Sequence, residues 1–124
     1  MPIISINHVQ VAMPEGKEDD ARAFYINILG FAEIQKPDVL VARGGVWFQS
    51  EGAQLHLGVE KDFHPARKGH PAFLVYDLDA MLEKVQRMGY EWDASQPPLE
   101  GYKRVHIYDP FGNRIELMET VSSQ

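Results

Sequence analysis

The second half of the chain repeats the pattern of the first half at an offset of about sixty residues. Each half starts with a strand that carries a histidine, continues with an amphipathic helix that ends at a glycine, and closes with further strands. His8 and His70 lie 62 residues apart, and His56 and Glu116 lie 60 residues apart. A repeat of this length predicts two copies of one structural unit, each with the element order βαβββ.

Apolar periodicity predicts the elements within each half. In the first half we expect a strand over residues 3–12, a helix that ends near residue 29, short strands over 31–34, 39–42 and 46–49, and a strand over 53–60. In the second half we expect a strand over 70–77, a helix that is capped by Asp79 and ended by Gly89, and a closing hairpin within 106–117. Strands and helices in this order predict an α+β fold class.

The chain of 124 residues is predicted to form a single domain, with repeat 1 over about 3–61, a polar linker over 61–69 and repeat 2 over about 70–119. A net charge of −6 without a basic cluster argues against a nucleic-acid partner. With no cysteine, the chain has neither a disulfide framework nor a thiolate nucleophile. No apolar run has the length of a membrane span or the character of a signal peptide, so we expect a cytoplasmic protein without a membrane partner.

Glu116 is the residue that most needs an explanation. It stands between Ile115 and Leu117 in a strand that is otherwise largely apolar, after the turn that contains Gly112. A carboxylate is costly to bury in such a strand unless it meets a cation or a metal ion. Glu116 therefore predicts a positively charged partner elsewhere in the chain.

The repeat supplies candidate partners. His8 and His70 occupy equivalent places on the first strands of the two units, and His56 and Glu116 occupy equivalent places on the last strands. Two curved units would bring these four positions to one concave surface. Neutral imidazoles and a carboxylate are ligands that suit Zn²⁺, Fe²⁺, Mn²⁺ or Ni²⁺. We therefore predict a divalent metal site formed by His8, His56, His70 and Glu116, and the identity of the metal stays open.

Each of these residues also has a purely structural explanation when it is taken alone. His8 can be a hydrogen-bonded core histidine, and half-buried strand histidines such as His56 are common. Glu116 can form an ion pair with Arg104 or Arg114. Four repeat-related positions that all carry metal-competent groups favour the metal site over these separate explanations.

Five segments together resemble the vicinal oxygen chelate superfamily, which includes glyoxalase I, fosfomycin-resistance transferases, extradiol dioxygenases, methylmalonyl-CoA epimerase and bleomycin-resistance proteins. The segments are Ile6-Asn7-His8-Val9-Gln10-Val11, Ala23-Phe24-Tyr25 with Leu29-Gly30-Phe31, Leu55-His56-Leu57, Gly69-His70-Pro71-Ala72-Phe73, and Asp109-Pro110-Phe111-Gly112-Asn113-Arg114-Ile115-Glu116-Leu117. The resemblance covers nearly the whole chain. It implies two βαβββ repeats that form a cupped eight-stranded mixed sheet, and a divalent metal that chelates substrate oxygens.

The resemblance leaves two ligand sets open. His8, His70 and Glu116 match the three-ligand pattern of the fosfomycin and dioxygenase branches, with His56 then left as an acid or base. Glyoxalase I and the epimerase have a fourth ligand at the position of His56. His106 stands where fosfomycin transferases place an active-site tyrosine, which implies a catalytic role or a contact with substrate.

The implied function is a metal-dependent lyase or isomerase of the glyoxalase type that acts on a small molecule. Ala12 and Glu60 stand where glyoxalase I carries its glutathione-binding residues, so glutathione specificity is not expected. Two alternatives stay open: an extradiol-type dioxygenase, and a metal-free protein of the bleomycin-resistance type that sequesters an antibiotic. The resemblance also implies a homodimer, in which the site can be built from both chains.

Overall fold

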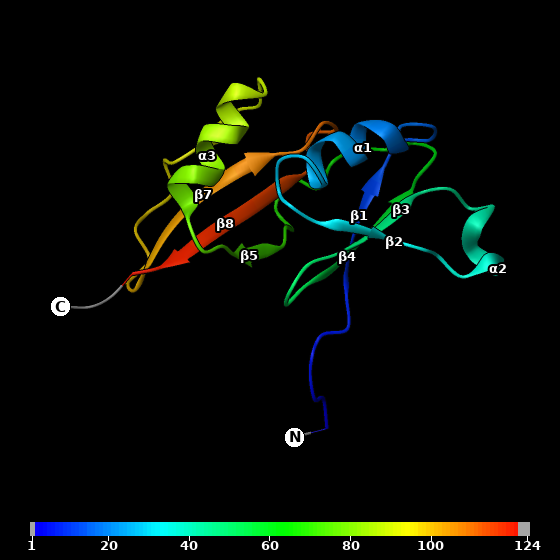
Figure 1. The fold of residues 1–124 in the computed structure, drawn as a ribbon, viewed down its shortest axis with the longest axis horizontal. Coiled ribbons are helices and arrows are strands. Elements are labelled where there is room, and N and C mark those ends of the chain that lie inside the picture. Colours follow the sequence, from blue (N-terminus) through cyan, green and yellow to red (C-terminus); the bar gives the residue numbers. More distant parts are fainter. Residues whose placement is uncertain (1, 122–124) are drawn as a thin grey trace. The chain divides into compact units, whose positions relative to one another are not determined.

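The computed structural model describes residues 2–121 and contains two compact units, Met1–His64 and Pro65–Gln124. Each unit is described by itself, and Figure 1 labels most of the elements. Unit 1 contains β1 (Val9–Met13), α1 (Glu18–Tyr25), β2 (Ala32–Ile34), α2 (Asp38–Val41), β3 (Val46–Gln49) and β4 (Gln54–Val59). Unit 2 contains β5 (Ala72–Leu74), α3 (Leu78–Arg87), β6 (Trp92–Asp93), β7 (Tyr102–Tyr108) and β8 (Arg114–Thr120).

The two units have the same sheet topology. The strand order is β1-β4-β3-β2 in unit 1 and β5-β8-β7-β6 in unit 2. In each sheet the first strand pairs in parallel with the last strand, and the other neighbours are antiparallel. The eight strands thus form two four-stranded mixed sheets, and the predicted α+β fold class with two βαβββ repeats is confirmed.

The core of unit 1 is formed where α1 packs against β3. Phe24 and Tyr25 from the helix are fully buried, and the Tyr25 ring stacks on the ring of Phe48 with their centroids 5.5 Å apart. The helix has an apolar stripe at the spacing of one face, so its burial against the sheet supplies the stability that a helix of this length lacks on its own.

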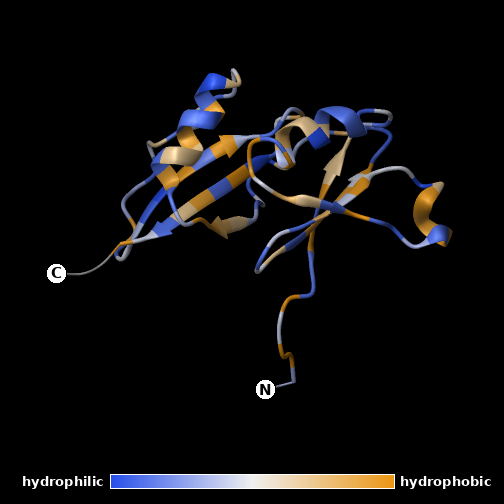
Figure 2. Ribbon diagram, viewed as in Figure 1, coloured by the Kyte–Doolittle hydropathy of each residue, from blue (hydrophilic) through white to orange (hydrophobic). Residues whose placement is uncertain are grey.

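The core of unit 2 lies between α3 and the β7–β8 hairpin. The helix contributes Leu78 and Val85, and the hairpin contributes Ile107, Ile115 and Leu117. Figure 2 shows hydrophobic and hydrophilic residues alternating along β7 and β8, as expected for strands that bury one face. The same β8 strand also carries the buried Glu116, so the core fixes the position of this carboxylate.

One expected strand and one expected helix cap are wrong, and the strand expected over residues 3–12 begins only at Val9. Residues 3–8 precede β1, because β4 offers partners only from Gln54 onward and the ladder between the two strands begins at Val9. Residues 38–41 form the short helix α2 after Pro37 instead of a strand. The cap of α3 is Asp77, whose side chain accepts a hydrogen bond from the Ala80 backbone N–H, so Asp79 is the second residue of the helix.

The first strand is also shorter than expected in unit 2, where β5 covers Ala72–Leu74 only. Ile3, Ile4 and Ile6 are 80–95% exposed in the segment before β1.

Among the described residues, no helix is long and apolar enough to cross a membrane.

A double-glycine turn leads into β3. Gly44 and Gly45 have φ angles of 74° and 85°, a region that favours glycine. A Cβ atom added to Gly45 would lie 2.2 Å from the Leu57 carbonyl oxygen, which belongs to the backbone of β4. Only a residue without a side chain therefore fits at Gly45.

We predict that Gly45→Ala destabilises the protein by at least about 1 kcal/mol, because it adds backbone strain and a clash with β4. The measurement is the free energy of unfolding in urea. Gly52→Ala is the matched control, since Gly52 has no positive φ and no atom within 4 Å of an added Cβ. Equal stability of the two variants would contradict the prediction.

Candidate functional site

Three side chains of unit 2 converge on one point of its sheet. His70 lies in the segment before β5, His106 on β7 and Glu116 on β8. His106 and Glu116 are direct cross-strand partners, and the parallel pairing of β5 with β8 places Ala72 on the other side of Glu116. The Glu116 backbone N–H donates to the Pro71 carbonyl oxygen, which holds the segment with His70 against β8.

The distances within this cluster are short. The Nε2 atom of His70 lies 3.0 Å from Oε1 of Glu116, and Nε2 of His106 lies 3.5 Å from the same oxygen. The potential ligand atoms of the three residues all lie within 4.8 Å of one another. Glu116 is 6% exposed and His106 is 3% exposed, so the cluster reaches into the interior of unit 2.

The second oxygen of Glu116 has a cationic partner. Arg104 donates from a terminal guanidinium nitrogen to Oε2 of Glu116 at 3.2 Å, and its other terminal nitrogen donates to the Pro97 carbonyl oxygen. Burial by itself raises the pKa of Glu116, but hydrogen bonds from His70 and Arg104 and the charge of Arg104 outweigh it. The pKa of Glu116 therefore lies below its ordinary value, and the carboxylate is ionised at neutral pH.

The contacts of His70 determine which of its ring nitrogens faces the Glu116 carboxylate. The Nδ1 atom lies 2.7 Å from the Lys68 carbonyl oxygen, and because a carbonyl only accepts, Nδ1 carries a proton. A neutral ring would then turn the lone pair of Nε2 toward Oε1 of Glu116, which is unfavourable because a carboxylate oxygen also only accepts. The 3.0 Å contact is satisfied either by a doubly protonated ring or by a cation between the two atoms.

His106 is the buried polar side chain in this cluster that lacks a hydrogen bond. Among the described residues, neither of its ring nitrogens has a hydrogen-bond partner. Burial lowers the pKa of His106, the charge of Glu116 partly offsets this, and His70 and Arg114 lower it further. The net pKa lies below the ordinary value of 6.5, so the neutral ring with one free lone pair predominates at neutral pH.

This donor set fits a divalent metal ion. Metal–ligand bonds of roughly 2.0–2.2 Å to nitrogen and oxygen place neighbouring ligand atoms roughly 3 Å apart. The contacts of 3.0 Å and 3.5 Å from the two imidazoles to Glu116 have this spacing. The hydrogen bond from His70 to a backbone carbonyl is also the outer contact that metal-ligating histidines typically make.

Unit 1 has aromatic rings at the equivalent places. The ring of His56 stacks between His8, with centroids 4.0 Å apart, and Trp47, with centroids 3.7 Å apart. His56 pairs across the strands with Trp47 as Glu116 pairs with His106. Burial lowers the pKa of His56, and the nearby His8 lowers it further. The Nε2 atom of His56 lies 2.8 Å from Oε1 of Gln54.

The structure therefore brings the residues predicted from the sequence together in two groups. His70, His106 and Glu116 form one group in unit 2, and His8 and His56 form the other in unit 1. Trp47 was not among the candidate site residues predicted from the sequence, although the repeat aligns it with His106. The repeat offset indicates the cross-strand register. This register is the signal that would have placed Trp47 beside His56.

Comparison with known proteins gives a consistent picture. The sequence model of the Glyoxalase/Bleomycin resistance protein/Dioxygenase superfamily matches residues 5–117. A crystal structure of a glyoxalase family protein from Bacillus anthracis is 45% identical, with a TM-score of 0.86 over 96% of this chain and 97% of the other. No curated protein sequence matches the chain.

Two further solved structures share the fold at lower identity. The fosfomycin resistance protein FosX from Listeria monocytogenes, in complex with Mn(II) and sulfate, is 19% identical, with a TM-score of 0.77 over 96% of this chain and 92% of the other. TnmS3, an antibiotic binding protein from Streptomyces sp. CB03234, is 23% identical, with a TM-score of 0.67 over 96% of this chain and 100% of the other.

The lowered pKa of His106 predicts a pH-dependent stability. The folded state resists protonation of His106 while the unfolded chain binds a proton near pH 6.5, so the free energy of unfolding decreases as the pH falls below that value. We expect the free energy of unfolding of His106→Phe to decrease less with falling pH than that of the parent protein. One group contributes at most about 1.4 kcal/mol per pH unit to this decrease.

The measurement is urea unfolding of the metal-free protein at pH 7.5 and pH 5.5. His64→Gln is the control, because His64 is an exposed residue outside the cluster. The prediction fails if His106→Phe keeps the whole pH dependence of the parent protein.

Proposed function

Because the chain belongs to the Glyoxalase/Bleomycin resistance protein/Dioxygenase superfamily, we propose that it is a divalent-metal-dependent enzyme of the lyase or isomerase type that acts on a small molecule. The observation that carries the proposal is the convergence of His70, His106 and Glu116 within 4.8 Å in unit 2. Two imidazoles and a carboxylate at this spacing are a donor set for Zn²⁺, Fe²⁺, Mn²⁺ or Ni²⁺. The Mn(II) in the FosX structure supports manganese as the first metal to test.

His70 and Glu116 are proposed as the two constant ligands. The Nε2 atom of His70 and Oε1 of Glu116 lie 3.0 Å apart, and because Nδ1 donates to the Lys68 carbonyl oxygen, Nε2 can offer its lone pair to a cation that replaces the proton between the two atoms. Two candidates for the third ligand follow from different observations. His8 is supported by its equivalence to His70 in the repeat, and His106 by its 3.5 Å distance from Glu116. His56 stays a candidate for a fourth ligand or for an acid or base.

The metal, when bound, supplies stabilisation of the negative charge that develops on neighbouring substrate oxygens. The side chains around it supply proton transfer and orientation. His106 is neutral at physiological pH because burial lowers its pKa, so its lone pair can accept a substrate proton if it is not itself a ligand. Arg104 holds the second oxygen of Glu116 and thereby fixes the direction of the carboxylate.

We predict that the protein binds Mn(II) and that His70→Ala and Glu116→Ala each weaken the binding more than tenfold, since each removes a metal ligand. Isothermal titration of the metal-free protein gives the dissociation constants. His64→Ala, which removes a histidine from an exposed position outside the cluster, should bind as the parent does. Unchanged binding in both ligand variants would contradict the proposal.

The same titration decides between His8 and His106. We expect the variant that removes the third ligand, His8→Ala or His106→Ala, to weaken Mn(II) binding more than tenfold, while the other variant keeps most of the affinity. If His8 is the ligand, His106→Ala lowers turnover instead, as expected for a residue that transfers a proton. If neither variant changes Mn(II) binding, both assignments are wrong.

The family also supports a homodimer in which both chains contribute to the site. Size-exclusion chromatography at several protein concentrations tests whether the protein is a dimer. Mixing His8→Ala chains with Glu116→Ala chains tests whether the site is shared. Only a mixed dimer whose site is built from both chains recovers a complete ligand set.

A metal-free antibiotic-binding protein is the second candidate, and two observations favour it. Arg104 already neutralises the buried Glu116, so the carboxylate has a partner without a metal. The stacked column of His8, His56 and Trp47 offers flat aromatic rings to a planar ligand. Thermal-shift measurements with dicarbonyl thioethers, catechols and antibiotics, each with and without Mn(II), separate the two functions. A ligand that stabilises the protein equally in both conditions favours the metal-free function.

A further inference from the structure

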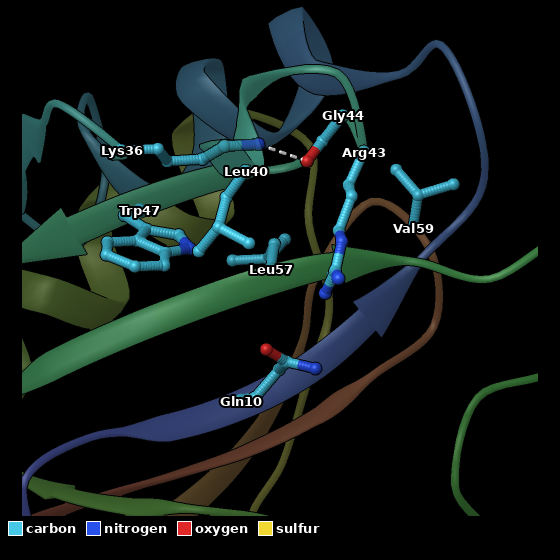
Figure 3. A pocket seen from close by; sticks show the side chains of 9 residues that line it. Gln10, Lys36, Leu40, Arg43, Gly44, Trp47, Leu57 and Val59 are labelled. Carbon is cyan, nitrogen blue, oxygen red and sulfur yellow. Dashed lines mark hydrogen bonds between the residues drawn. The ribbon is translucent and has the colours of Figure 1, made fainter. Parts of the chain in front are cut away.

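Unit 1 contains a pocket that the proposed metal site does not use. It has a volume of about 210 Å³ and lies between the sheet and the segment that joins β2 to β3, which includes α2 (Figure 3). The residues that define its character are Gln10, Lys36, Leu40, Arg43, Trp47 and Gly58. Among the described residues, its lining includes two cationic side chains and no acidic one, although the chain as a whole has a net charge of −6.

The segment that carries the two cations is held in place at its end. The Lys36 ammonium donates to the Gly44 carbonyl oxygen, and the Gly45 backbone N–H donates to Oε2 of Glu18 at 2.8 Å. An ammonium has three donors, so Lys36 has two further N–H groups beyond the one that Gly44 accepts. Figure 3 shows the Arg43 side chain extending from the turn toward the strands, where Gln10 also projects.

The floor of the pocket is shaped by the absence of a side chain at Gly58. A Cβ atom at this position would lie 2.8 Å from Nε2 of Gln10, so a larger residue would displace the carboxamide. Gln10 therefore lies over Gly58 and offers an amide donor and acceptor to the pocket. Leu40 and Trp47 supply the apolar part of the lining.

Trp47 connects the pocket to the aromatic column of unit 1. The indole lines the pocket and stacks on His56, with an interplanar angle of 4°. Gln10 is also a direct strand partner of His56. Gln10 and Trp47 both pair directly with His56. These two residues thus separate a molecule bound in the pocket from His56, the candidate metal ligand or base.

We propose that this pocket binds the oxyanion group, a carboxylate or a phosphonate, of a small organic anion whose flat or apolar part lies against Trp47. Arg43 and Lys36 provide charge-assisted hydrogen bonds to the oxyanion, and Gln10 adds a neutral donor. The inference rests on the proposed function in one respect, since it names the bound anion as the substrate of that enzyme. The anion site itself needs no metal.

The experiment uses the 124-residue chain with Trp92→Phe, so that Trp47 is the remaining tryptophan. The protein is freed of metal with EDTA, because a bound metal would itself attract an oxyanion. Trp47 fluorescence is followed during titration with benzoate, with phenylphosphonate and with benzamide, which matches benzoate in shape but has no charge. We expect at least one of the two anions to bind about tenfold or more tightly than benzamide, as expected for charge-assisted hydrogen bonds.

Variants test whether the two cations cause this preference. Arg43→Gln should weaken binding of the anion about tenfold, and Arg43→Lys should keep more of the affinity because it keeps the charge. Lys61→Gln is the control, since Lys61 is an exposed cation of the same unit that does not line the pocket. Equal affinity for the anions and benzamide, or equal effects of Arg43→Gln and Lys61→Gln, would overturn the proposal.

The two proposals fail in distinguishable ways. Selective anion binding that depends on Arg43 in the metal-free protein, together with no binding of Mn(II), supports the pocket and contradicts the metal-dependent function. Binding of Mn(II) through His70 and Glu116 without any preference of the pocket for anions supports the function and contradicts the anion site.

Discussion

The parallel pairing of the first and last strands in each unit is the constraint on which the rest of the structure depends. It joins β1 to β4 and β5 to β8, strands that lie at opposite ends of each repeat in the sequence. This pairing sets His8 against His56 and His70 against Glu116. The third strand of each sheet then adds Trp47 or His106 on the other side. One backbone arrangement thus produces a group of three side chains in each unit.

The two groups have different chemistry because their residues differ at equivalent positions. In unit 2 a buried carboxylate requires charged or polar partners, and His70 and Arg104 supply them. In unit 1 the equivalent position holds an imidazole, which is satisfied by stacking and one hydrogen bond to Gln54. The divergence of the repeats therefore gives one unit a cluster suited to a cation and the other an aromatic surface next to a basic pocket.

Residues 38–41, which form α2 rather than the expected strand, contribute to the pocket of unit 1. Leu40 of this helix lines the pocket together with Trp47 and Gly58. The Gly44–Gly45 turn, held to Glu18, then returns the chain to β3 with Arg43 directed toward the strands. The segment that was wrongly predicted as a strand thus belongs to a candidate binding site.

The sequence by itself determined the repeat, the βαβββ order and the α+β fold class, because hydrophobic periodicity and the repeat offset report which positions share a face. It did not determine where strands end, since a strand such as β1 extends only as far as its partner does. The sequence also left Arg104 and Arg114 as alternative partners of Glu116, and in the folded chain Arg104 forms the ion pair. The stacking of Trp47 on His56 and the burial of His106 depend on cross-strand register and side-chain packing, which only the folded chain decides.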